Sequence, residues 1–157
     1  MKKITPFLWF DGQAEEAANF YTAIFKNSKI GEVTRYGKGT PELEGRVMTI
    51  SFELEGMQFT ALNGGPHFHF TEAISFVVDC QSQAEVDALW EKLTDGGEES
   101  QCGWLKDKFG VSWQIVPREL IELLNDPDPD KAQSVTEAML QMKKIDLPTL
   151  RAAHARG

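Results

Sequence analysis

The feature that most constrains this chain is a pattern that occurs twice. Residues 4–25 and 73–93 each contain an apolar run of about seven residues, a short polar turn and a segment that opens on Gln-Ala-Glu. In both segments the apolar residues after the turn recur at helical spacing. A repeat of this length predicts two copies of one supersecondary unit, each beginning with a strand and a helix.

Alternating or apolar stretches typical of strands follow each helix, at residues 29–36, 46–54 and 57–62 in the first copy and 99–102, 104–106 and 111–116 in the second. Glu55-Gly56 predicts a tight hairpin, and Gly64-Gly65-Pro66 marks the boundary between the copies. We therefore predict an α+β fold made of two tandem βαβββ modules, residues 1–65 and 70–117, with curved mixed sheets.

The pattern changes after Pro117, where three helical segments are expected at 118–124, 131–143 and 147–154. The run from Asp126 to Asp130 contains two prolines, which separates the first two helices and supplies a capping acid for the second. Residues 118–157 should form a C-terminal helical arm that packs on the modules or on a partner subunit, with gating of a ligand as the alternative.

Composition excludes several functions. The formal net charge is −8, which argues against binding to nucleic acid because phosphate contacts need clustered Lys and Arg. No apolar run approaches the roughly 20 residues that a membrane helix needs. Cys80 and Cys102 form neither a CxxC motif nor a secreted disulfide pattern, so a cytoplasmic protein is expected.

The doubled pattern resembles the glyoxalase/bleomycin-resistance/dioxygenase superfamily, also called the vicinal-oxygen-chelate superfamily. Within it the chain is similar to the PhnB-like branch, whose domain is catalogued as 3-demethylubiquinone-9 3-methyltransferase. The matching segments extend over nearly the whole chain and are residues 6–10, 14–17, 19–21, 61–66, 75–76, 102–107, 113–114, 126–128, 131–132 and 138–140.

Metal-dependent members of that superfamily hold a divalent ion with four side chains, mostly His and Glu, that point into a cup formed by the curved sheets. On this sequence the resemblance puts Pro6, Ala61, Ala73 and Gln114 at those positions. Three of them have no donor atom, and one neutral amide cannot hold a divalent cation against water. We expect no metal and no cofactor.

Small and polar residues on one face of the expected strands predict a cavity, since a strand set built only for packing fills both faces. If Gln114 faces the cup, so do Ser112 and Val116. If Ala73 faces it, so do Ser75 and Val77, and Ile74 faces the helix. The candidate ligand-binding residues are Gln114, Ser75, Asn63, Thr49, Ser51, Cys102 and Trp104.

Each candidate has a structural alternative. Gln114 and Ser75 either orient a ligand or hydrogen-bond within the fold. Cys102 is a reactive thiolate only beside a positive group, and otherwise an inert buried cysteine. Trp104 lines a pocket or belongs to the core. His67 and His69 share a face but are expected to be loop residues without a physiological metal.

Three functions are consistent with this fold and these candidate residues. The first is a metal-free protein that binds a small metabolite in the cup. The second is a metal-independent enzyme, an isomerase, epimerase or group-transfer enzyme, that uses Gln114 or Cys102. The third is an S-adenosylmethionine-dependent methyltransferase, which the catalogued description suggests but which lacks the expected Gly-rich first turn. A homodimer is expected, and the cup closes either within one chain or across two.

Overall fold

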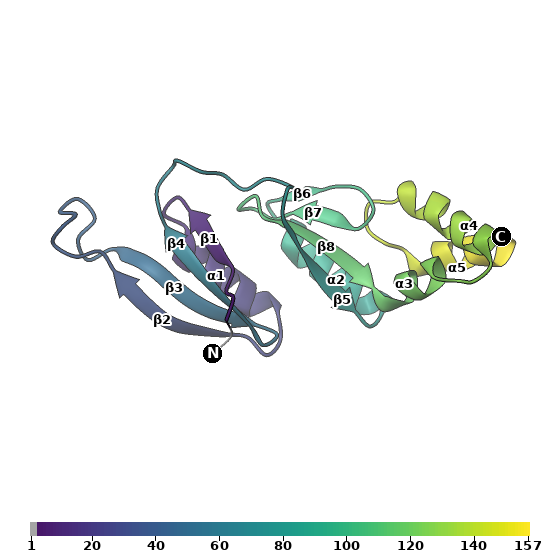
Figure 1. Cartoon of the computed structure of the whole chain (residues 1–157), viewed down its shortest axis with the longest axis horizontal. Helices are drawn as coiled ribbons and strands as arrows, with labels where there is room; N and C mark the ends of the chain where they lie inside the picture. Colours follow the sequence, from purple (N-terminus) through teal and green to yellow (C-terminus); the bar gives the residue numbers. More distant parts are fainter. Residues whose placement is uncertain (1–2) are drawn as a thin grey trace. The chain divides into compact units, whose positions relative to one another are not determined.

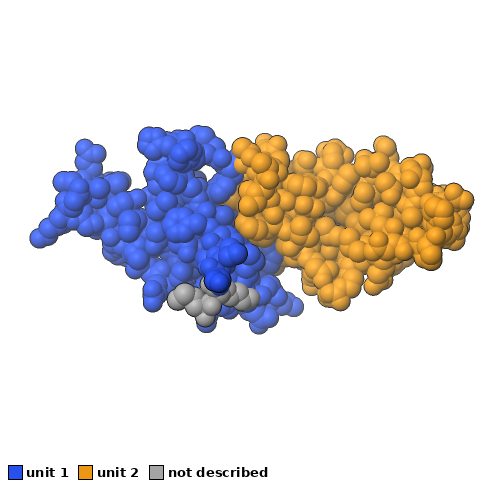
Figure 2. Space-filling model, in the orientation of Figure 1, with its two compact units in different colours: residues 1–70 blue, residues 71–157 orange. Residues whose placement is uncertain are grey.

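The computed structural model describes residues 3–157, which form two compact units, the first ending at Phe70 and the second comprising residues 71–157 (Figure 2). Each unit contains one four-stranded mixed sheet with one helix packed on it (Figure 1). The order in each case is strand, helix and three strands. The α+β class and the doubled βαβββ order predicted from the repeat are therefore confirmed.

The first unit has the elements β1 (Phe7–Phe10), α1 (Ala14–Ile24), β2 (Lys29–Arg35), β3 (Val47–Leu54) and β4 (Met57–Asn63), with sheet order β1-β4-β3-β2. β1 pairs with β4 in parallel, and the other neighbours are antiparallel. Glu55 and Gly56 both adopt positive φ, at 49° and 82°, in the hairpin between β3 and β4. The hairpin expected from Glu55-Gly56 is present.

α1 packs on one face of this sheet because alternate strand residues are apolar. Ile50, Phe52 and Leu54 of β3 are buried, and the ring of Tyr21 on α1 stacks on Phe52 with centroids 6.0 Å apart. Burying each such side chain stabilises the unit by about 1.5–3 kcal/mol. The remaining residues of β3 project to the opposite face.

The second unit has the elements β5 (Ser75–Cys80), α2 (Gln83–Thr94), β6 (Glu98–Glu99), β7 (Trp104–Lys106) and β8 (Ser112–Pro117), with sheet order β5-β8-β7-β6. Ser82 caps α2 by accepting a hydrogen bond from the Glu85 amide at 3.2 Å, as expected for a serine before a helix. α2 buries Val86, Leu89, Trp90 and Leu93. β6 is shorter than predicted and begins one residue earlier.

Three further helices complete the second unit: α3 (Arg118–Leu124), α4 (Pro129–Leu140) and α5 (Leu147–Arg156). Asp128 caps α4, as the acidic run predicts. α4 ends at Leu140, before the predicted Lys143. The helices share a small core of their own, which consists of Leu120, Val135, Ile145, Leu147 and Leu150.

The segment between α4 and α5 is fixed to the second sheet and to α2. The amides of Cys102 and Gly103 donate to the carbonyls of Met142 and Lys143 at 2.8 and 2.7 Å. The Gln83 side chain donates to the carbonyl of Ile145 at 2.9 Å and accepts from the amide of Leu147 at 2.7 Å. The three helices therefore attach to the module through paired polar groups as well as through apolar contact.

One position differs from the expected alternation, and one keeps its side of the sheet but has different neighbours from those expected. Ile74 was expected to face the helix but precedes β5 and is 64% exposed. Val116 was expected to line the cup, but it packs against the core of the C-terminal helices because α3 follows β8 directly. Within residues 3–157, no helix is both long enough and apolar enough to cross a bilayer.

Asp107 organises the turn between β7 and β8. Its side chain is nearly fully buried and accepts hydrogen bonds from the amides of Phe109 and Val111 at 2.9 and 3.1 Å and from the Trp113 indole at 2.9 Å. The carboxylate thus fixes the turn and the orientation of a core tryptophan together.

We predict that Asp107→Ala lowers the free energy of unfolding by about 3 kcal/mol, because it leaves buried donors without an acceptor. Urea unfolding followed by tryptophan fluorescence measures this change. Asp95→Ala, at an exposed position after α2, is the matched control and should shift stability by less than about 0.5 kcal/mol. Equal effects of the two substitutions would contradict the role given to Asp107.

Acid should weaken the contacts that hold the C-terminal helices together. The Asp128 amide, and then His154, hold the pKa of Asp126 below its usual value, and Arg151 does the same for the pKa of Glu119. Since both pKa values are lower in the folded protein, their stabilisation is complete above the unfolded value of about 4 and is lost as the pH falls below it. The protection factors of the amides in α3 and α5, which correct hydrogen exchange for its intrinsic pH dependence, should fall below about pH 4.

Arg151→Gln provides the control for this pH dependence. It removes the ion pair with Glu119, so the variant should begin with faster exchange at neutral pH and change less on acidification. A pH dependence identical to that of the unmodified protein would show that this ion pair does not contribute.

Candidate functional site

Each sheet has one face covered by its helix and an opposite face, which we call the open face. In the second unit, Leu105, Trp113 and Ile115 are buried on the side of α2. Residues that pair across strands point to the same side, so the register assigns the open face directly. Its residues on the four strands are Ser75, Val77, Glu98, Trp104, Lys106, Ser112 and Gln114.

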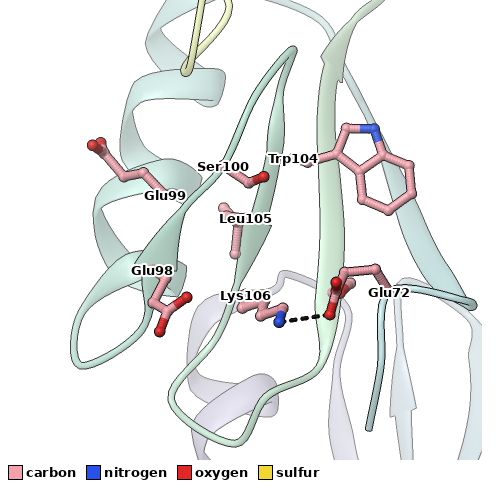
Figure 3. Close-up of a pocket in the computed structure, with 8 residues that line it drawn as sticks. Glu72, Glu98, Glu99, Ser100, Trp104, Leu105 and Lys106 are labelled. Carbon is pink, nitrogen blue, oxygen red and sulfur yellow. Dashed lines mark ion pairs between the residues drawn. The ribbon is translucent and has the colours of Figure 1, made fainter.

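A cavity of about 150 Å³ lies on this unit, next to the edge strand β6 and its neighbour β7 (Figure 3). Its lining residues are Glu72, Glu98, Glu99, Ser100, Trp104, Leu105, Lys106 and Ser112. We call it the β6–β7 cavity. Its lining residues comprise three glutamates, one lysine, two serines, one leucine and one tryptophan, so most of them are polar and one is aromatic.

Lys106 supplies the only ammonium group among the lining residues, and it is paired with Glu72 at 2.6 Å (Figure 3). This hydrogen bond raises the pKa of Lys106, and Lys106 lowers the pKa of Glu72. Lys106 is therefore a charged hydrogen-bond donor at neutral pH and is unsuited to act as a general base. Both side chains are partly exposed, at 35% and 62%, so the pair contributes little to stability.

Ser112 lies directly across from Lys106 in the antiparallel pairing of β7 and β8. The residue is 1% exposed, and its hydroxyl has no hydrogen-bond partner among the described residues. A buried hydroxyl without a partner costs about 1–3 kcal/mol. An unsatisfied donor at the wall of a polar cavity is the kind of group that a ligand can satisfy.

Gln114 and Ser75 lie beside this cavity on the same open face. The Gln114 amide donates to the Ser75 hydroxyl at 2.9 Å, so the two candidates form the hydrogen-bonded pair considered from the sequence. Gln114 is also the strand partner of Trp104, whose indole ring lines the cavity. The structure thus brings together Ser75, Gln114 and Trp104 from the predicted set.

The three candidates on the first unit have local structural partners. Thr49 lies 2.6 Å from the Thr34 hydroxyl across β2 and β3. Ser51 accepts from the Glu32 amide at 2.7 Å. Asn63 accepts from the Ala14 amide at 2.8 Å and donates to the Val47 carbonyl at 3.1 Å, so it holds the first turn of α1 against the sheet.

The cysteines and the loop histidines lie outside this group of residues. Cys102 has a positive φ of 57° in the loop before β7 and does not line the β6–β7 cavity. Cys80 is fully buried, as expected, and burial raises the pKa of its thiol to about 12. His67 and His69 are both exposed.

The positions assigned to metal ligands need one correction. Ala61 was placed on the side of the cup, but it pairs with Ile50 and is fully buried on the side of α1. The open-face positions of β1 and β4 are instead Phe7, Trp9, Thr60 and Leu62. None of these side chains is suited to hold a divalent cation, and no three His, Cys, Asp or Glu residues converge within residues 3–157. The donor set does not fit a metal.

Sequence reasoning missed Lys106, Glu72, Glu98 and the hydroxyl without a partner. Ser112 was correctly assigned to the face of Gln114, but the register of β7 against β8 was not known. If residues 107–110 are taken as a tight turn between two antiparallel strands, counting outwards from the turn pairs Lys106 with Ser112, as the structure shows. Glu72 lies before β5, where no periodicity applies.

Comparison with known proteins identifies the family. The family model described as 3-demethylubiquinone-9 3-methyltransferase matches residues 2–116. A PhnB protein from Bacillus cereus that carries the same description is 39% identical, with a TM-score of 0.68 over 74% of this chain and 99% of its own. A search of curated proteins gives no significant match.

Two more distant structures share the fold. A protein from Pseudomonas aeruginosa is 21% identical, with a TM-score of 0.61 over 74% of this chain and 98% of its own. The fosfomycin resistance protein FosX from Listeria monocytogenes, solved with Mn(II) and sulfate, is 17% identical, with a TM-score of 0.54 over 79% of this chain and 97% of its own. With the topology, the family match shows that this chain belongs to the PhnB-like family described as 3-demethylubiquinone-9 3-methyltransferase, within the vicinal-oxygen-chelate fold.

Proposed function

We propose that this protein binds a small organic metabolite at the open face of its second sheet, without a metal ion. The observation that carries the proposal is the Ser112 hydroxyl, buried and without a partner at the wall of the β6–β7 cavity. Polar groups that converge on a concave surface are the usual mark of a small-molecule site. The Gln114–Ser75 pair extends the polar surface beside the cavity.

The metal-independent enzyme is a second proposal with less support from the geometry. Its candidate nucleophile, Cys102, lies outside the cavity, and Lys106 is held protonated by Glu72. Cys102 therefore does not supply an activated nucleophile at the cavity, and Lys106 does not supply a general base.

The methyltransferase suggested by the family description has the least support. S-Adenosylmethionine enzymes of the usual kind bind the cofactor at the Gly-rich first turn of a parallel sheet. Both sheets here are mixed, and each first strand is followed by a helix that opens on Ala14 or Gln83 without such a turn.

We expect protein stripped with a chelator to keep its fold and to show a ligand-induced rise in Tm with at least one member of a broad metabolite panel. S-Adenosylmethionine, included in the panel, should give no shift. Elemental analysis after purification without added metal should find far less than one zinc, nickel, iron or manganese per chain. Gln114→Ala should weaken the response, because it removes the amide beside the cavity.

Gln133→Ala, on the exposed surface of α4, is the matched control and should respond as the unmodified protein does. The absence of any response across the panel would reject metabolite binding. One tightly held transition metal per chain, or a response to S-adenosylmethionine alone, would favour the other functions instead.

We also propose that the protein acts in the cytoplasm as a homodimer. Support for pairing comes from the edge strand β2, where all seven residues are exposed, including Ile30 and Val33 at 39% and 42%. Exposed edges of this kind favour association with another strand or chain.

Light scattering at tens of micromolar should therefore give a mass twice the 17.6 kDa of one chain. Val33→Lys should shift the distribution towards single chains, since a charge on an edge strand opposes pairing. A mass of one chain for the unmodified protein at that concentration would reject the dimer.

A further inference from the structure

We propose that the β6–β7 cavity binds a small, neutral, polyhydroxylated molecule, a polyol or a sugar ring. This inference rests on the proposed function and names the ligand class for the same site. It is carried by the charges, the hydrogen-bonding groups and the aromatic wall of the cavity.

The charges argue against an anionic ligand, and Lys106 argues against a cation at Ser112. Glu72 and Glu98 face one cation among the lining residues, Lys106, so a carboxylate or phosphate would meet a net negative surface. That surface attracts an organic ammonium group, but beside Ser112 the ammonium would lie next to the charged Lys106. A neutral ligand avoids the repulsion by the carboxylates and the repulsion by Lys106.

The hydrogen-bonding groups favour hydroxyls. Pairing across β6, β7 and β8 puts Glu98, Lys106 and Ser112 in one row on the open face. Adjacent strands lie about 4.8 Å apart, so the row extends over about 10 Å and alternates an acceptor, a donor and a hydroxyl that can do either. Neighbouring hydroxyls of a polyol can each donate and accept, and therefore match such a row.

The indole of Trp104 supplies the apolar part of the site. It lies on the open face two residues before Lys106, and its ring is at the cavity (Figure 3). An aromatic face can pack against the C–H groups of a sugar ring or polyol chain while the rim forms hydrogen bonds. The Glu99 carboxylate is not needed to bind the ligand, because it already accepts a hydrogen bond from the Trp90 indole at 2.7 Å.

Access to the Ser112 hydroxyl requires a small side-chain movement. The hydroxyl is buried, and the side chain directly across from it is Lys106. The exposed Lys106–Glu72 pair is weak, so rotation of Lys106 towards a ligand has a low cost. A ligand hydroxyl could then occupy the position between them and satisfy Ser112.

The test is a titration of the full chain, followed by NMR of the tryptophan indole N–H groups. Three sets of probes are compared at equal concentration: neutral sugars and polyols such as glucose, arabinose, inositol and ribitol; acetate, lactate and citrate; and ethylamine and putrescine. We expect saturable shifts of the Trp104 signal, assigned with Trp104→Phe, from at least one member of the first set and none from the others.

Ser112→Ala is the decisive variant because it separates binding from folding. Removing a buried hydroxyl without a partner should leave Tm unchanged or raise it. The same change should weaken binding of the polyol about fivefold, as expected for one lost hydrogen bond. Ser28→Ala, in the first unit, is the control and should change neither quantity.

The outcomes distinguish this inference from the proposed function. Preference for the carboxylates or the amines would overturn the ligand class and leave metabolite binding in place. Polyol binding that Ser112→Ala does not weaken would overturn the assignment to this cavity. No binding by any of the three sets overturns the ligand class, and no response in the broader panel as well would reject metabolite binding itself.

Discussion

Packing of one helix on one face of each sheet is the constraint on which the rest of this structure depends. Because strand residues alternate, covering one face with α1 or α2 fixes which residues are left on the other. In the second unit that alternation buries Trp113 and Ile115 and leaves Ser112 and Gln114 on the open face. The polar cavity is thus a direct result of the packing that stabilises the sheet.

The sequence predicted the elements well because periodicity and turn chemistry were both clear. The repeat, the Glu55-Gly56 hairpin and the position of α3 all agree with the structure. Ala61 was assigned to the wrong face because its position was taken from the family resemblance and not from the alternation of residues along its strand. Its pairing with Ile50 resolves the question.

The candidate site was only partly predictable. Gln114, Ser75 and Trp104 follow from alternation within single strands, but Lys106 and Glu72 require knowledge of which strands are neighbours. Asn63 shows the opposite limitation. A polar residue at a strand end suggests a ligand contact, whereas the half-buried Asn63 uses both ends of its amide to join α1 to the sheet. Local sequence does not distinguish these two uses.

The attachment of the C-terminal helices has a consequence for any exchange of these helices between proteins. The family model ends at residue 116, yet Gln83 and Gly103 inside the matched region bind the segment that joins α4 to α5. A side chain added at Gly103 would also meet Ile145 at 3.1 Å. The module and its extension are therefore mutually adapted. Transferring residues 118–157 to another member of the family would require a glycine and a glutamine at the corresponding places.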